Sequence, residues 1–178
     1  MIKKVLAAVV LISLLTVAIV QAVNKNSDVP ESANTTSAAK EGLSVGAKAP
    51  DFELKTLTGD SVKLSDLKGK KVMLNFWATW CPPCKEEMPA MEKLHKEAGE
   101  DLLILAVNID PHLDVQGFVN ENKLTFPILL DTDDTVNEKY QILSIPTTYF
   151  IDSKGIIQHV SLGSMEYDEM KELTKKLK

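Results

Sequence analysis

Residues 71–85 read KVMLNFWATWCPPCK, and this stretch decides the fold. Its first half, residues 71–77, is a short apolar run, which is typical of a strand that is buried on both faces of a sheet. The two cysteines of the chain, Cys81 and Cys84, follow directly. A helix is predicted from about residue 82 to residue 98, because its apolar positions form one stripe at helical spacing. A Cys-x-x-Cys pair therefore lies between a buried strand and a helix.

The start of a helix is a favourable place for a reactive cysteine. The first turn has free backbone N–H groups and the positive end of the helix dipole, and both stabilise a thiolate. The thiolate is the attacking species in disulfide exchange. We expect Cys81 to be exposed and activated there, and Cys84 to be close enough to form a disulfide with it. Pro82 and Pro83 fit the first turn, where a missing N–H costs nothing.

A zinc site and an inert disulfide are weaker interpretations of the cysteine pair. A structural zinc site needs four ligands. The chain has two cysteines, and its histidines, His95, His112 and His159, do not have metal-ligand spacing. An inert disulfide across so short a loop would constrain the chain very little. The position of the pair therefore favours a redox-active disulfide, and we expect no metal and no cofactor.

The flanking segments predict an α/β domain. Alternating polar and apolar residues at 51–54 and 61–64 surround a turn and predict a β-hairpin. Further strands are predicted at 102–109, 127–130, 147–151 and 156–160, and further helices near 115–119, 136–140 and 167–177. Strands that alternate with helices form a parallel half, and the late hairpin adds an antiparallel half. The expected architecture is a mixed central β-sheet flanked by helices.

The N-terminus has the pattern of a targeting segment. Lys3 and Lys4 precede an uncharged apolar stretch at residues 5–20, as in a signal peptide or an N-terminal anchor. Residues 20–22 form an acceptable cleavage site, whereas residues 5–23 approach the ~20 residues that span a bilayer. We favour a signal-anchor in residues 1–23, followed by a flexible tether in residues 24–42 and the folded domain in residues 43–178.

Both interpretations of the N-terminus put the domain outside the cytoplasm, because the lysines stay inside. An uncleaved anchor places it on the outer face of the cytoplasmic membrane, and cleavage would make it secreted or periplasmic. The net charge of −5, from 20 basic and 25 acidic residues, argues against a nucleic-acid partner. We expect the domain to be monomeric.

Three separated motifs resemble those of a known superfamily. Residues 75–85, NFWATWCPPCK, followed by Pro89, resemble the active site of the thioredoxin superfamily. Residues 144–148, SIPTT, resemble its cis-proline loop. Residues 46–52, GAKAPDF, and the anchor resemble the ResA/TlpA/StoA branch of membrane-tethered oxidoreductases. The resemblance implies a thioredoxin fold with an N-terminal β-hairpin extension and a central helical insert at about residues 111–122.

The resemblance also implies roles for residues near the cysteines. Cys81 would be the nucleophile that forms the mixed disulfide, and Cys84 the resolving thiol. Glu87 follows Cys84 by three residues on the same helical side. It is either a solvated first-turn glutamate or a carboxylate that moves protons to or from the thiols. Asn75 stands where cytosolic thioredoxins have a buried acid, which shifts that task to Glu87 or to water.

The remaining candidate residues would contact the substrate. Pro146, in cis, would lie beside the sulfurs and prevent metal binding. Ile145 would offer backbone hydrogen bonds to an extended substrate, with Thr147 alongside. Trp80 adjoins Cys81 and is expected on the surface in contact with a partner, whereas Trp77 is expected in the core.

These expectations favour an extracytoplasmic thiol–disulfide oxidoreductase that reduces protein disulfides. The resemblance implies a membrane dithiol donor of the CcdA/DsbD kind and a client in cytochrome c maturation or sporulation. An oxidase would run the same chemistry backward, in a direction set by the redox potential.

Two further alternatives remain. A thiol peroxidase of the AhpC/TSA type shares the opening motif, but Ala78 and Leu74 stand where its P-x-x-x-T-x-x-C motif requires threonine and proline. A non-catalytic tethered binding module or chaperone would not need the cysteine pair, although fold alone does not exclude it.

Overall fold

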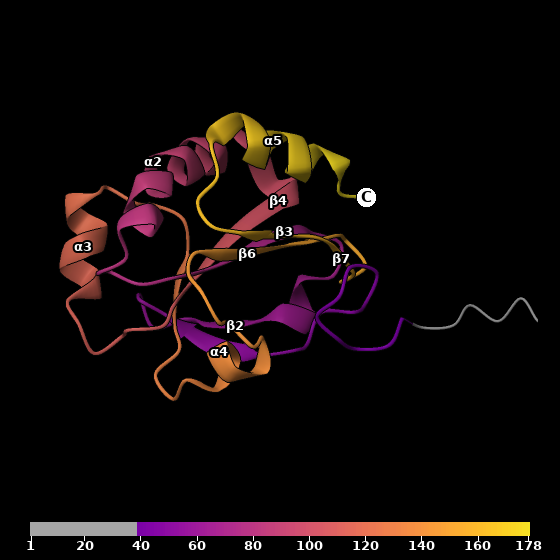
Figure 1. Cartoon of the computed structure of the whole chain (residues 1–178), viewed down its shortest axis with the longest axis horizontal. Helices are drawn as coiled ribbons and strands as arrows, with labels where there is room; N and C mark the ends of the chain where they lie inside the picture. The colour runs from indigo at the N-terminus through magenta and orange to yellow at the C-terminus, as the bar shows by residue number, and fades with distance from the viewer. Residues whose placement is uncertain (1–38) are drawn as a thin grey trace, which may run out of the picture. The chain divides into compact units, whose positions relative to one another are not determined.

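The computed structural model describes residues 39–178, which are built around a seven-stranded sheet in the order β2-β1-β5-β4-β3-β6-β7 (Figure 1). The strands are β1 (Glu53–Thr56), β2 (Ser61–Lys63), β3 (Lys71–Trp77), β4 (Leu102–Asn108), β5 (Ile128–Leu130), β6 (Thr147–Ile151) and β7 (Ile157–Leu162). The helices are α2 (Pro82–Glu97), α3 (Val115–Glu121), α4 (Thr135–Lys139) and α5 (Tyr167–Lys176), with 3-10 turns η1 (Leu64–Leu67) and η2 (Gly99–Asp101).

The sheet has a parallel half and an antiparallel half, as predicted. β3, β4 and β5 pair in parallel, whereas β6 pairs with β3 and β7 with β6 in antiparallel register. The predicted N-terminal hairpin forms from β1 and β2, and β1 extends the sheet by pairing antiparallel with β5. The helix of the predicted insert is α3, between β4 and β5. The mixed sheet flanked by helices is therefore confirmed.

Helices cover both faces of the sheet. α2 and α5 lie over one face, and α4 lies on the opposite face (Figure 1). Side chains of β3 alternate between two apolar cores: Met73 and Trp77 belong to the core under α2, and Val72, Leu74 and Phe76 to the other. Because successive side chains of a strand point to opposite faces, a strand buried on both sides is mainly apolar, and Asn75 is the polar exception in the buried part of β3.

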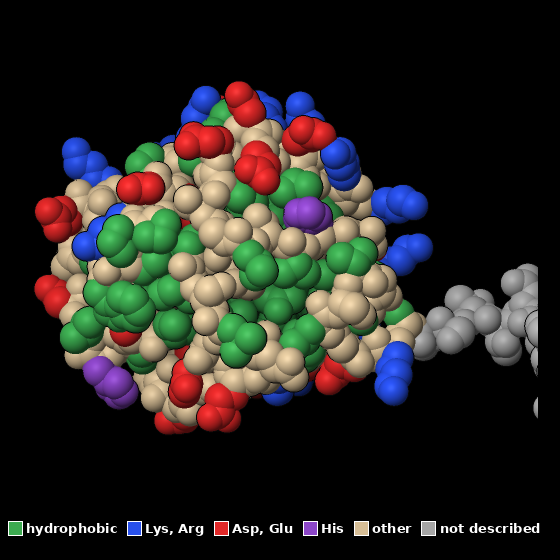
Figure 2. Space-filling view, in the orientation of Figure 1, with side chains coloured by type: hydrophobic (Ala, Val, Ile, Leu, Met, Phe, Trp, Pro, Cys, Tyr) green, Lys and Arg blue, Asp and Glu red, His purple; other side chains and the backbone are tan. Residues whose placement is uncertain are grey.

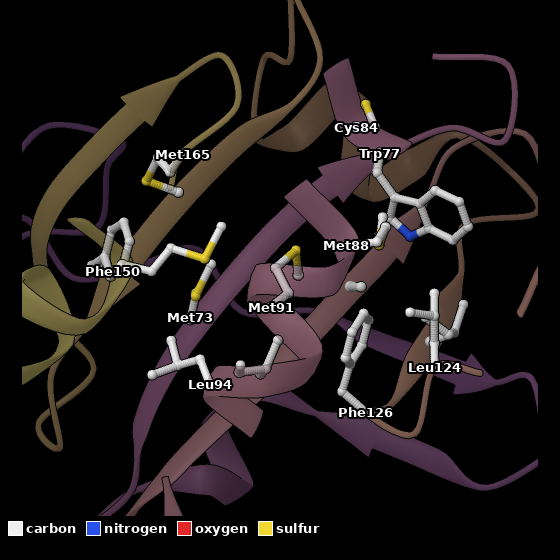
Figure 3. Close-up of a cluster of buried hydrophobic side chains, with 14 of the residues drawn as sticks. Met73, Trp77, Cys84, Met88, Met91, Leu94, Leu124, Phe126, Phe150 and Met165 are labelled. Carbon is white, nitrogen blue, oxygen red and sulfur yellow. The ribbon is translucent and has the colours of Figure 1, made fainter. Parts of the chain in front are cut away.

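The core beneath α2 is rich in methionine. Met88 and Met91 of α2 pack with Met73 of β3 and with Met165, and Cys84 belongs to the same cluster (Figure 3). Methionine is unbranched and polarisable, so it fills irregular space against sulfur and aromatic groups. The second cysteine is therefore fixed in an apolar environment.

The predicted anchor in residues 1–23 lies outside the described residues, as does most of the predicted tether. Backbone pairing begins at Lys40, whose carbonyl accepts from the N–H of Lys48, and Gly42 N donates to the carbonyl of Lys48. Among residues 39–178, no helix has both the length and the apolar character needed to cross a membrane.

Candidate active site

Cys81 is the N-cap residue of α2, and Cys84 lies in the first turn. The two form a disulfide bond, with Cα atoms 5.3 Å apart. The backbone N–H of Cys84 points at Sγ of Cys81 at 3.3 Å, so sulfur takes the place of a capping oxygen. In the reduced protein this N–H and the helix dipole would stabilise a thiolate on Cys81 rather than on Cys84.

The expectation that Cys81 is exposed is wrong for the disulfide-bonded protein. Cys81 is 3% exposed and Cys84 is fully buried. The loop before β6 covers the first sulfur, because Sγ of Cys81 lies 3.8 Å from the carbonyl oxygen of Ile145. Trp80 is 61% exposed and Trp77 is buried, as expected for a surface and a core tryptophan.

The loop beside the sulfurs contains a cis peptide bond between Ile145 and Pro146, as the resemblance implied. Two hydrogen bonds hold this loop in place. Gly163 N donates to the carbonyl of Pro146 at 2.8 Å, and the hydroxyl of Thr147 donates to the carbonyl of Ser144 at 2.7 Å. The N–H of Ile145 makes no backbone hydrogen bond within residues 39–178, so it can donate to an incoming extended chain.

Glu87 is the buried carboxylate of the site. It is 1% exposed and lies on the sheet-facing side of α2, as does Cys84. Oε1 accepts a hydrogen bond from the side-chain amide of Asn75 at 2.8 Å, and Oε2 accepts one from the backbone N–H of Met165 at 3.3 Å. Burial raises the pKa of Glu87 to about 7, because both donors are neutral and only partly offset the loss of water. The solvated alternative for Glu87 is therefore wrong.

Asn75 connects this carboxylate to the sheet. Its amide nitrogen donates to Glu87 and also to the hydroxyl of Thr148 on β6, at 2.9 Å. The residue is fully buried, and its side-chain oxygen has no partner among the described residues. An amide at this position orients the carboxylate without adding a charge, which leaves Glu87 free to change protonation near neutral pH.

Asp110 was not a candidate from the sequence, yet it holds the loop that leads into the cysteine pair. Its carboxylate accepts hydrogen bonds from the backbone N–H and the hydroxyl of Thr79, at 3.1 Å and 2.6 Å. It also accepts one from the side-chain amide of Asn108 at 2.5 Å. Asp110 follows β4, which is parallel to β3. A polar residue beyond the carboxyl end of the neighbouring parallel strand is the signal that could have indicated it.

Comparison with known proteins agrees with this geometry. Residues 45–160 match the family model described as AhpC/TSA family. The chain is 49% identical over 142 residues to "Thioredoxin-like protein YneN" of Bacillus subtilis, covering 78% of this chain and 83% of that one. It is 41% identical over 134 residues to "Thiol-disulfide oxidoreductase ResA" of the same organism, covering 74% and 75%. The crystal structure of StoA from Bacillus subtilis superimposes with a TM-score of 0.64 at 34% identity, covering 72% and 98%.

The chain belongs to the ResA/StoA-like thiol–disulfide oxidoreductases. The fold of this oxidoreductase is the thioredoxin fold with the expected hairpin and insert. The structure brings Cys81, Cys84 and the Ile145–Pro146 bond together at one end of the sheet, and it places Glu87 on the same helix as the cysteines. The described residues form a compact unit with cores of their own, and the part of the chain that matches StoA corresponds to 98% of the chain in that crystal structure.

Proposed function

We propose that this oxidoreductase reduces protein disulfides outside the cytoplasm, with Cys81 as the nucleophile and Cys84 as the resolving thiol. The observation that carries the proposal is the position of the Cys81–Cys84 disulfide at the start of α2, against the carbonyl of Ile145. Of the two cysteines, Cys81 alone combines a helix N-cap position with contact to the loop before β6.

The reaction consists of two exchange steps that conserve atoms and electrons. The Cys81 thiolate attacks one sulfur of the substrate disulfide, the S–S bond breaks, and the other substrate sulfur leaves as a thiolate that takes up a proton. Cys84 then loses its proton and attacks Sγ of Cys81, which releases the second substrate thiol. The substrate gains two electrons and two protons, and the protein is left with the Cys81–Cys84 disulfide.

Glu87 is proposed to accept the proton from Cys84 in the second step. Cys84 is buried among apolar side chains, which disfavours its thiolate until a base removes the proton. Glu87 lies three residues further along the same helix, on the same side, with a pKa of about 7. A base with a pKa near the working pH is efficient at general base catalysis.

The substrate is proposed to bind as an extended segment across the end of the sheet. The N–H of Ile145, which makes no backbone hydrogen bond among the described residues, supports this geometry, and Pro146 and Thr147 keep that backbone at the sulfurs. Trp80, which is largely exposed next to Cys81, supplies an aromatic surface for the segment that carries the disulfide.

The membrane assignments are part of the same proposal. Residues 1–23 would anchor the protein, and the part of residues 24–42 that precedes Lys40, where pairing with the domain begins, would tether it. The domain would work on the outer face of the cytoplasmic membrane. A membrane dithiol protein of the CcdA/DsbD kind would return Cys81 and Cys84 to thiols. The proposed client takes part in cytochrome c maturation or sporulation, as the resemblance of the sequence motifs implies.

The midpoint potential of the Cys81–Cys84 couple tests the direction of the reaction. The domain is equilibrated in dithiothreitol buffers of stated potential, and the fraction oxidised is measured by thiol alkylation. A value near that of thioredoxin, about −270 mV, supports a reductase. A value near that of the oxidant DsbA, about −120 mV, would make the protein a disulfide donor and would contradict the proposal.

A further inference from the structure

Several large hydrophobic side chains remain exposed on the folded domain. Among residues 39–178 they are Trp80 (61% exposed), Leu113 (54%), Leu143 (97%), Leu162 (73%) and Val45 (61%). Hydrophobic side chains gather in groups over the surface seen in Figure 2, between areas of acidic and basic residues. Contiguous exposed apolar groups on a soluble domain indicate a contact surface.

Three of these side chains adjoin the two loops at the sulfurs. Trp80 is the neighbour of Cys81 in the chain. Leu162 is the strand partner of Thr147, and Leu143 directly precedes the cis-proline loop, residues 144–148. These three lie in or next to the loops that hold the sulfurs, so they extend the substrate surface of the proposed function.

Leu113 belongs to a different part of the chain, the start of the insert between β4 and α3. Its backbone N–H donates to the carbonyl of Asp110 at 3.0 Å. The carboxylate of Asp110 in turn holds both the N–H and the hydroxyl of Thr79, the residue before Trp80. The insert therefore begins with a turn that is fastened to the cysteine loop and carries an exposed leucine.

Polar groups on both sides of this turn are paired within the domain. Asp110 N donates to the side-chain oxygen of Asn108 at 3.2 Å, and the Asn108 amide donates back to Asp110. Asp114 caps α3 by accepting from Gly117 N at 2.8 Å. An exposed apolar side chain on a turn that hydrogen bonds hold at both ends can bind a partner with less loss of conformational entropy than one on an unrestrained segment.

We infer that Leu113 is a specificity residue for protein substrates and that Asp110 is a positioning residue that links the turn of Leu113 to the loop that leads into Cys81. The partner is the client polypeptide itself, which would place an apolar side chain against Leu113 while its disulfide lies at Cys81. The inference rests on the proposed function and adds the insert to the substrate surface. A small disulfide, which cannot reach beyond the sulfurs, would not use this contact.

Steady-state reduction of two substrates by the purified domain tests the inference, with insulin as the protein disulfide and oxidised glutathione as the small one. For Leu113→Ser we expect roughly a tenfold increase in KM for insulin, in proportion to the apolar area of one leucine. We expect kcat for insulin, the rate with glutathione and the midpoint potential to stay unchanged. Val45→Ser is the matched control, because Val45 is similarly exposed but lies away from the sulfurs. Its neighbour Gly46 donates a hydrogen bond to Ile157, at the opposite end of β7 from Leu162.

The double variant Asp110→Ala Leu113→Ser tests the positioning role. If Asp110 acts by holding Leu113, the double variant has the same KM for insulin as Asp110→Ala alone. Additive increases would overturn the positioning role. Equal KM values in Leu113→Ser and Val45→Ser would overturn the specificity role, as would an equal loss with glutathione. Failure of the unmodified domain to reduce insulin while it reduces glutathione would instead contradict the proposed function.

Discussion

Helix α2 buries two glutamates little more than one turn apart, and their surroundings shift the pKa of each in opposite directions. Glu87 is 1% exposed and receives hydrogen bonds from two neutral donors, an amide of Asn75 and the N–H of Met165. Glu92 is 8% exposed. Its carboxylate accepts hydrogen bonds from the N–H and the hydroxyl of Thr125, at 2.8 Å and 2.6 Å, and forms an ion pair with Lys96 at 3.0 Å.

The same element therefore holds one carboxylate ready to take up a proton and another fixed as an anion. Burial raises the pKa of Glu87 to about 7. Burial also acts upward on the pKa of Glu92, but the hydrogen bonds from Thr125 and the charge of Lys96 outweigh it and leave that pKa below its usual value. Depth alone does not decide the role of a buried acid; the charge and number of its donors do.

Replacing Glu87 or Glu92 with glutamine should distinguish the two carboxylates most clearly in the pH dependence of the reaction rate. With pre-reduced domain and insulin in single turnover, the wild-type rate should rise through pH 7 as Glu87 ionises. Glu87→Gln should lose this step and react roughly a hundredfold more slowly at pH 8, since it lacks a general base. Glu92→Gln is the matched control and should keep the profile. An unchanged profile in Glu87→Gln would contradict the proton-transfer role.

The stability of the oxidised domain should show the same contrast. Glu87 binds a proton more tightly in the folded state than in the unfolded state, whose pKa is near 4.5. Its contribution is therefore present below about pH 4.5 and is lost as the pH rises to about 7, a change of about 3 kcal/mol. Urea unfolding between pH 4 and pH 8 should show this decline in wild type and not in Glu87→Gln. Parallel curves for the two proteins would rule it out.

Glu92 should contribute with the opposite dependence on pH. Its lowered pKa means that its contribution is present above the ordinary glutamate value and disappears as the pH falls through the folded-state value. At pH 7, Glu92→Gln should lower the free energy of unfolding by about 1–3 kcal/mol, because Thr125 loses a charged acceptor. Glu86→Gln, at an exposed position of the same helix, is the control and should change stability by less than about 0.5 kcal/mol.

The smallest effect should come from the cation near Glu92. Lys96 is 63% exposed, so its ion pair is screened by water and salt. Lys96→Met should lower the free energy of unfolding by less than about 1 kcal/mol, and roughly 0.5 M NaCl should remove the difference. A loss as large as that in Glu92→Gln would mean that Lys96, rather than Thr125, stabilises the carboxylate.

Local patterns in the sequence predicted the elements that surround the cysteines. The apolar run of β3 and the stripe of α2 each lie within one segment, so neighbouring residues carry the whole signal. The pairing of β1 with β5 could not be predicted this way, because it joins distant segments through backbone hydrogen bonds that leave no periodic mark.

The site was predictable to a similar extent. The Cys-x-x-Cys motif identified Cys81 and Cys84, and the resemblance identified Pro146. The burial of Glu87 depends on Asn75 and Met165, which come from different elements, and the burial of Cys81 depends on the loop at Ile145. Asp110 was missed for the same reason: it follows β4, whereas its partner Thr79 lies in the connection between β3 and α2.

The central claim is that Cys81 attacks protein disulfides, and trapping the mixed disulfide tests it most directly. The Cys84→Ser domain is reduced, mixed with insulin, quenched with acid and analysed by mass spectrometry after digestion. We predict a one-to-one adduct on Cys81 that persists because no resolving thiol is present, and no adduct in a parallel sample of Cys81→Ser. Adduct formation on Cys84 in Cys81→Ser at the same rate would contradict the account.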